Sequence, residues 1–158
     1  MAQREKTEPV ELTNMVMVYD PQSNRAVVQR RVKSWKGVTF PGGHVEPEES
    51  LVDSAVREVR EETGLAISQL EPCGVIHWST GHGRPRYLVF LYKTCHYQGE
   101  LLAATDEGAV WWQELDTLPQ LDLCKNFDLY LPLFLEGGYC EVYGTGIEAD
   151  DSRRITYK

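Results

Sequence analysis

The chain has 158 residues, of which 42% are hydrophobic and 25% are charged, a composition typical of a globular protein rather than a disordered one. Its net charge of −8 argues against binding to a nucleic-acid polymer, which requires an excess of Lys and Arg. The four cysteines form no CxxC pair, and the sequence contains no run of about 18 apolar residues. We therefore expect a single domain over residues 1–158 that is cytoplasmic and does not bind a membrane.

The predicted elements begin with a β-hairpin. Residues 12–32 form two β-rich runs joined by a turn at residues 20–24. Further strands are predicted in residues 37–40, 73–80, 86–94 and 108–115. Residues 123–137 are typical of a helix that Pro132 kinks or divides. The tail, residues 137–158, is open to three interpretations: a terminal hairpin, a dimer contact or a loose segment.

Another helix is predicted over residues 51–63. Ser50 and Asp53 fit a capping box at its start, and Gly64 fits a left-handed cap at its end. At about 100° per residue, one stripe of this helix is expected to pack on a sheet. That stripe consists of Val52, Ala55, Val56, Val59 and Thr63. The order strands, helix, strands, helix indicates an α/β (α+β) fold with a mixed sheet.

The opposite side of this helix is acidic. Glu58, Glu61 and Glu62 project from consecutive turns, and Glu49 in the preceding loop can reach the same region. One interpretation is a solvated face that is balanced by the arginines of the same helix. The alternative is a metal site, because the glycine pair at 42–43 lets a backbone carbonyl approach a ligand. Carboxylates and a carbonyl are the oxygen ligands that Mg²⁺ or Mn²⁺ prefers.

The segment from Gly43 to Leu65 resembles the signature of the Nudix hydrolases, GX5EX7REUXEEXGU, where U is a bulky aliphatic residue. Five residues separate Gly43 from Glu49, seven more precede Arg57, and every specified position is matched. The resemblance implies an α/β/α sandwich over most of the chain. It also implies metal-dependent hydrolysis of a nucleoside diphosphate linked to another group, X.

The resemblance also implies roles for individual residues. The metal ligands would be Glu58, Glu61, Glu62, the Gly42 carbonyl and, as ligand or neighbour of a ligand, Glu49. Arg57 would orient a glutamate through a salt bridge, and Glu107, ahead of the strand at 108–115, would be the general base or a further ligand. The predicted catalytic residues are therefore Arg57, Glu58, Glu61 and Glu107, with Mg²⁺ or Mn²⁺ as cofactor.

Within the family the chain most resembles the MutT-like branch, which converts 8-oxo-dGTP to its monophosphate and pyrophosphate. By that resemblance Arg31 would contact a phosphate, Phe40 would line the base pocket, and Arg86 and Asp122 would contact the purine. The alternatives are a solvated strand residue, a core residue, a surface charge and a helix N-cap, respectively. Other substrates also remain open, namely another NTP, ADP-ribose, a nucleotide sugar, a dinucleoside polyphosphate or an RNA 5′ end. So does a non-catalytic nucleotide-sensing module. In either case we expect the protein to be a monomer or a homodimer.

Overall fold

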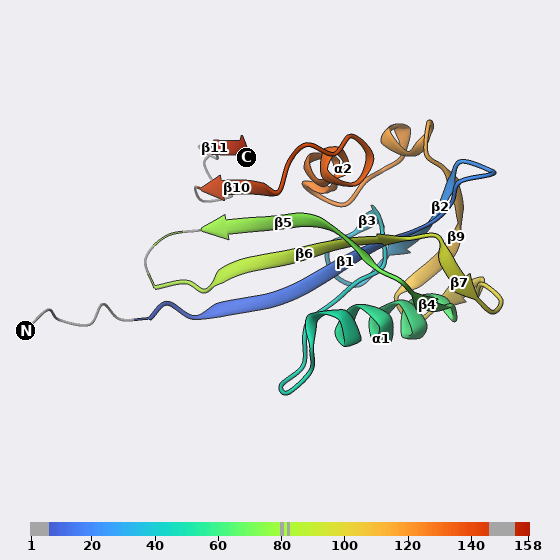
Figure 1. Ribbon diagram of the computed structural model, residues 1–158, viewed down its shortest axis with the longest axis horizontal. Coiled ribbons are helices and arrows are strands. Elements are labelled where there is room, and N and C mark those ends of the chain that lie inside the picture. Colours follow the sequence, from blue (N-terminus) through green and yellow to red (C-terminus); the bar gives the residue numbers. More distant parts are fainter. Residues whose placement is uncertain (1–6, 80, 82, 146–153) are drawn as a thin grey trace, which may run out of the picture.

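The computed structural model describes residues 7–79, 81, 83–145 and 154–158. Most of its strands form one large mixed sheet in the order β11-β10-β5-β6-β1-β2-β9-β8, with β3 paired to β2 (Figure 1). These strands are β1 (Val10–Asp20), β2 (Arg25–Arg31), β3 (Gly37–Thr39), β5 (Glu71–Ser79), β6 (Arg86–Thr94), β8 (Ala104–Thr105), β9 (Gly108–Glu114), β10 (Glu141–Thr145) and β11 (Arg154–Tyr157). Two short strands that the sequence does not mark, β4 (Ala66–Ser68) and β7 (His96–Gln98), pair with each other.

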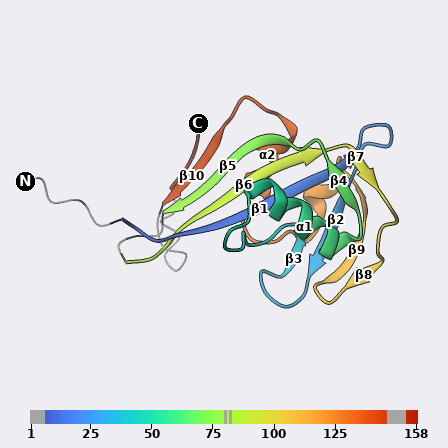
Figure 2. The same cartoon turned by 60° about the horizontal axis from the view of Figure 1, so that its bottom comes forward.

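Helices cover both faces of the sheet. Helix α1 (Leu51–Thr63) lies against one face and α2 (Phe127–Leu135) against the other, as both views show (Figures 1 and 2). Ala55 and Val59 of α1 pack on Val16, while Phe127 and Phe134 of α2 join a second buried cluster on the opposite side. The predicted α/β/α sandwich with a mixed sheet is therefore confirmed.

The hairpin of β1 and β2 is paired at its closed end, where Tyr19 lies opposite Ala26. Nearer the start of β1, the loop that precedes α1 hydrogen-bonds to the strand instead. Asn14 N donates to the Gly43 carbonyl at 2.9 Å, and Val16 N donates to the Pro41 carbonyl at 2.8 Å. The glycine loop thus takes the place of a neighbouring strand, and its backbone is fixed on β1 before the chain enters α1.

Helix α1 has the bounds that its caps predict. The Ser50 hydroxyl accepts from Asp53 N at 3.0 Å, and Gly64 has a left-handed backbone with φ 80°. The predicted apolar stripe is wrong at one end, because Val52 is 45% exposed while Ser54 is fully buried. Asn14 on β1 makes this exchange possible, since its amide donates to the Ser54 hydroxyl at 2.8 Å and so satisfies a polar group against the sheet.

Helix α2 is shorter than the predicted 123–137 segment and starts after Asn126, which has a left-handed backbone with φ 68°. Pro132 lies inside the helix and does not divide it. In the tail, β10 pairs parallel with β5 and antiparallel with β11; residues 146–153 lie outside the described part. No helix among the described residues is long and apolar enough to span a membrane.

Candidate active site

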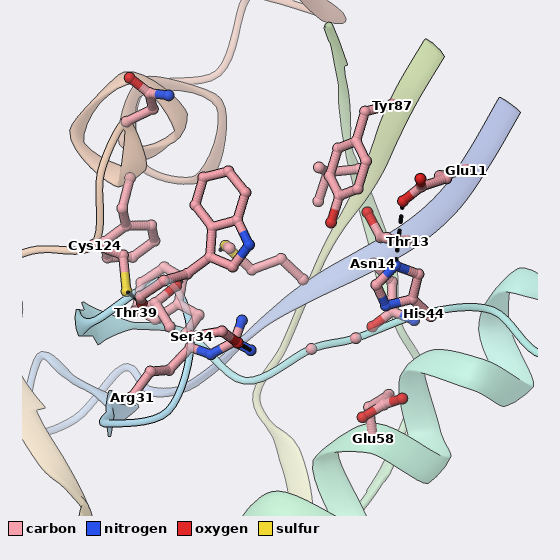
Figure 3. Close-up of a pocket in the computed structure, with 18 of the residues that line it drawn as sticks. Glu11, Thr13, Asn14, Arg31, Ser34, Thr39, His44, Glu58, Tyr87 and Cys124 are labelled. Carbon is pink, nitrogen blue, oxygen red and sulfur yellow. Dashed lines mark hydrogen bonds and ion pairs between the residues drawn. The ribbon is translucent and has the colours of Figure 1, made fainter. Parts of the chain in front are cut away.

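A cleft of about 930 Å³ opens between the glycine loop, the β2–β3 connection and the start of α2. Figure 3 shows Glu58 on α1 at one side of it, with Arg31 and Cys124 across the cleft from Tyr87. The floor lies on the sheet and includes Val89 of β6. The cleft therefore extends from the acidic signature helix to the opposite layer of the sandwich.

Arg57 holds three of the signature carboxylates. Its Nε and Nη2 donate to the two oxygens of Glu49 at 2.7 and 2.9 Å. Its Nη1 donates to Glu58 at 2.9 Å and to Glu61 at 3.2 Å. These bonds lower the pKa of Glu49 to about 2, with help from the backbone amide of Glu46, and they raise the pKa of Arg57. Arg57 is thus the fixed centre of the acidic cluster and lies outside the cleft lining.

Glu58 points into the cleft beside the glycine loop. Its side chain is only 15% exposed, and burial raises its pKa although Arg57 acts in the opposite direction. A Cβ at Gly43 would overlap with the Glu58 carboxylate. Any larger residue at position 43 would therefore force the Glu58 carboxylate to move.

Glu62 is turned inward, contrary to the expectation that it projects beside Glu58 and Glu61. One of its oxygens, Oε2, accepts from Gly42 N and from Gln29 Nε2, both at 2.8 Å. Burial, followed by repulsion from Glu58, raises its pKa to about 7. The helical period places Glu62 on the side of the sheet, three residues after the buried Val59, and Gln29 of β2, 33 positions away, supplies a buried donor there.

The donor set fits a hard divalent cation. Burial raises the pKa of both Glu58 and Glu62, and Glu58 raises that of Glu62 further, so a cation between them would favour their charged forms. Among the described residues no three acidic, His or Cys side chains converge as a ready cage. Glu49 and Glu61 are instead hydrogen-bonded to Arg57, and one oxygen of Glu62 accepts a hydrogen bond from Gly42 N.

Three further predicted residues line the cleft. Arg31 donates from Nη2 to the Ser34 hydroxyl at 3.3 Å, and its buried Nε has no hydrogen-bond partner among the described residues. Glu107 lies 3.6 Å from Lys33 Nζ. Phe40 is 1% exposed and packs edge-on against the rings of α2, so it is both a core residue and part of the cleft floor.

The structure does not bring Arg86 or Asp122 to this cleft. Arg86 hydrogen-bonds to Glu8 and to His77, on the other face of β6 from Tyr87, which does line the cleft. Successive side chains of a strand point to opposite faces, so Arg86 lies on the face away from the cleft. The Asp122 side chain is 83% exposed and lies 3.4 Å from Arg30, while its carbonyl accepts from Val38 N.

Several cleft residues were not predicted from the sequence. They include Trp35, Trp78, Arg84, Tyr87, Asn126 and Tyr130. Trp78 donates from Nε1 to the Tyr130 hydroxyl at 3.0 Å, which joins β5 to α2 at the cleft. Asn126 brings a side-chain amide to the start of α2, four positions beyond Asp122. Its signal in the sequence is an Asn directly before an apolar helix, which marks a helix start.

The NUDIX domain family model matches residues 11–134, more than half of the chain. An uncharacterized Nudix hydrolase, YvcI of Bacillus subtilis, is 25% identical over 93% of this chain and 92% of its own. The oxidized purine nucleoside triphosphate hydrolase of Mus musculus is 30% identical over 79% of this chain and 80% of its own. The Bacillus halodurans MutT protein superposes with a TM-score of 0.72 at 22% identity, over 92% of this chain and 97% of its own. The chain therefore belongs to the Nudix hydrolase family and is a pyrophosphohydrolase.

Proposed function

We propose that this enzyme hydrolyses purine nucleoside triphosphates, with 8-oxo-dGTP as the preferred class, to the monophosphate and pyrophosphate. The observation that carries this proposal is a single cleft with carboxylates at one end and aromatic rings and an amide at the other. Such a cleft suits a ligand with a charged phosphate chain and a planar base. The 30% identity to a mouse enzyme named for oxidized purine triphosphates supports the same substrate class.

At the acidic end, Glu58, Glu62 and the Gly42 carbonyl would hold Mg²⁺ or Mn²⁺, with Glu61 and Glu49 beside them. When bound, the ion would neutralise phosphate oxygens and acidify a water molecule. Arg57 would keep the carboxylates in place through the bonds described above.

Arg31 would bind a phosphate, because its guanidinium lies in the cleft lining and has an unpartnered buried Nε. Glu107 would accept the proton of the attacking water. Its carboxylate lines the same cleft, and the adjacent Lys33 holds it at 3.6 Å. These two residues face the phosphate chain from the β2–β9 side of the sheet.

At the other end, the Asn126 amide would bind the edge of the purine, since an amide can both donate and accept hydrogen bonds. It takes the place that we expected Asp122 to fill. Phe40, Trp78 and Tyr130 provide the apolar surroundings of the base. A role in the pool of free nucleotides would place the enzyme in the cytoplasm.

The test is a hydrolysis screen ranked by kcat/KM, with and without EDTA. The panel contains oxidised and canonical (d)NTPs, ADP-ribose, nucleotide sugars, dinucleoside polyphosphates and capped RNA 5′ ends. We expect metal-dependent turnover that is highest on oxidised purine triphosphates, with monophosphate and pyrophosphate as products. Diphosphate and orthophosphate as products, or a higher kcat/KM on another class, would refute the substrate assignment. Binding without turnover in Mg²⁺ would indicate a sensing module instead.

A further inference from the structure

Trp35 lies in the β2–β3 connection and lines the cleft, yet its side chain is largely in solvent. All four tryptophans belong to the described part of the chain, and only Trp35 is exposed, at 55%. The others are partly buried and packed in the protein; Trp78, for example, donates a hydrogen bond to Tyr130. An indole in water at the edge of a cleft offers a large apolar surface that a ligand can cover.

The backbone that carries this indole is held at several points. The Cys124 thiol, which is buried, donates to the Trp35 carbonyl at 2.8 Å. One residue earlier, the Ser34 hydroxyl accepts from Arg31 at 3.3 Å. Trp35 itself has a left-handed backbone with φ 49°, an uncommon conformation for a residue with a large side chain. The surrounding contacts therefore hold Trp35 in a conformation that it would seldom adopt alone.

Gly37 presses the same connection against the segment before α2. Its backbone has φ 125°, and a Cβ there would lie 2.6 Å from Cys124 N. Val38 N also donates to the Asp122 carbonyl at 2.8 Å, and Cys124 N donates to the Val38 carbonyl at 2.9 Å. The position of Trp35 is thus tied to the chain that leads, two residues after Cys124, into Asn126 and α2.

We propose that the Trp35 indole is the stacking surface for the nucleobase of the substrate, and that Cys124 is the residue that positions it. This inference rests on the proposed function. A rigid aromatic side chain provides contact area at a low cost in conformational entropy, and every base has a π-face that can stack on it. Trp35 therefore selects for substrates that carry a planar base, while the polar groups of the cleft distinguish one base from another.

The experiment compares Trp35→Ala and Trp35→Phe with wild type. Val32→Ala is the matched control, because Val32 is 51% exposed in the same connection and does not line the cleft. Titration calorimetry with dGMP measures binding, and dGTP hydrolysis separates KM from kcat. We expect Trp35→Ala to raise the Kd for dGMP and the KM for dGTP by about tenfold while kcat changes less than about twofold. For Trp35→Phe both constants should stay within about threefold of wild type. For Val32→Ala they should equal those of wild type.

Fluorescence separates this inference from the proposed function. Quenching of tryptophan emission by dGMP should fall in Trp35→Phe to the share that Trp78 in the same cleft contributes, a readout that requires no turnover. A protein that binds dGMP through Trp35 but hydrolyses no purine triphosphate would refute only the proposed function. Wild-type affinity in Trp35→Ala, a fall in kcat instead of a rise in KM, or equal losses in the Ala and Phe variants would overturn the stacking role. Cys124→Ala should weaken dGMP binding more than Cys124→Ser, which keeps a donor for the Trp35 carbonyl.

Discussion

Glu62→Gln should make the metal-free protein more stable at alkaline pH. Burial raises the pKa of Glu62 from 4.5 to about 7, so its ionised form is disfavoured in the folded protein. Each pKa unit corresponds to about 1.4 kcal/mol, so ionising this carboxyl group lowers the free energy of unfolding by about 3 kcal/mol. Gln has nearly the same shape, and its one oxygen can still accept from Gly42 N and Gln29.

The sign of the pH dependence follows from the raised pKa. Below pH 4.5 Glu62 is protonated in both the folded and the unfolded chain, so wild type and variant should be equally stable. As the pH rises through 7, wild type loses the stability that the variant keeps. At pH 8 the difference should approach about 3 kcal/mol, or roughly 6–12 °C in Tm for a chain of this size.

Urea denaturation in EDTA at pH 4.5, 6 and 8 measures this difference. Glu61→Gln is the control, since the Glu61 side chain is 59% exposed and its pair with Arg57 contributes less than about 0.5 kcal/mol. Saturating Mg²⁺ should then stabilise wild type more than Glu62→Gln, because the variant lacks the carboxylate that we propose as a ligand. If the variant is less stable than wild type at pH 8, or differs by the same amount at all three pH values, burial is not what disfavours the Glu62 charge.

Three further predictions concern the cluster and its surroundings. Arg57→Ala should lower kcat/KM at least about a hundredfold in a protein whose circular dichroism is unchanged, because Glu58 loses the group that orients it; full activity would exclude a positioning role. Gly43→Ala should displace the Glu58 carboxylate and so abolish most activity. Its free energy of unfolding in urea should change by less than about 1 kcal/mol, because the flexible Glu58 side chain moves before the backbone does. An active variant would show that the carboxylate can act from a second position. Arg86→Ala and Asp122→Ala should keep kcat/KM within about twofold of wild type, since neither side chain reaches the cleft. A large rise in KM for either variant would show that its side chain contacts the substrate.

The parts that could be predicted from the sequence are those fixed by neighbours in the chain. Helix α1 has the predicted bounds because Ser50 and Gly64 act within one turn of its ends. The signature also brings Arg57, Glu58 and Glu61 together by helical spacing alone. Local hydrogen bonds and a 3.6-residue period were sufficient here.

Most of the parts that failed depend on contacts between distant segments. Glu62 lies three residues after the buried Val59, so the helical period itself turns it toward the sheet. That an acid is tolerated there depends on Gln29 of another strand, which donates a hydrogen bond to it. Tyr87 and not Arg86 lines the cleft, because a shift of one residue reverses the face of a strand, and only the pairing of β6 with β1 and β5 fixes that register. Asn126 and not Asp122 lines the cleft, and α2 begins later than its apolar pattern suggests.

Separate segments of the chain carry two duties that could evolve at different rates. The carboxylates of the signature and the arginine that restrains them belong to α1 and the loop before it, while the side chains that would touch a base come from β5, from α2 and the residue before it, and from the segment around β3. Mutations in the second set of side chains can therefore retune which nucleotide is accepted without disturbing the hydrolytic apparatus. The preferred nucleotide could then change during evolution while the enzyme keeps its hydrolytic activity.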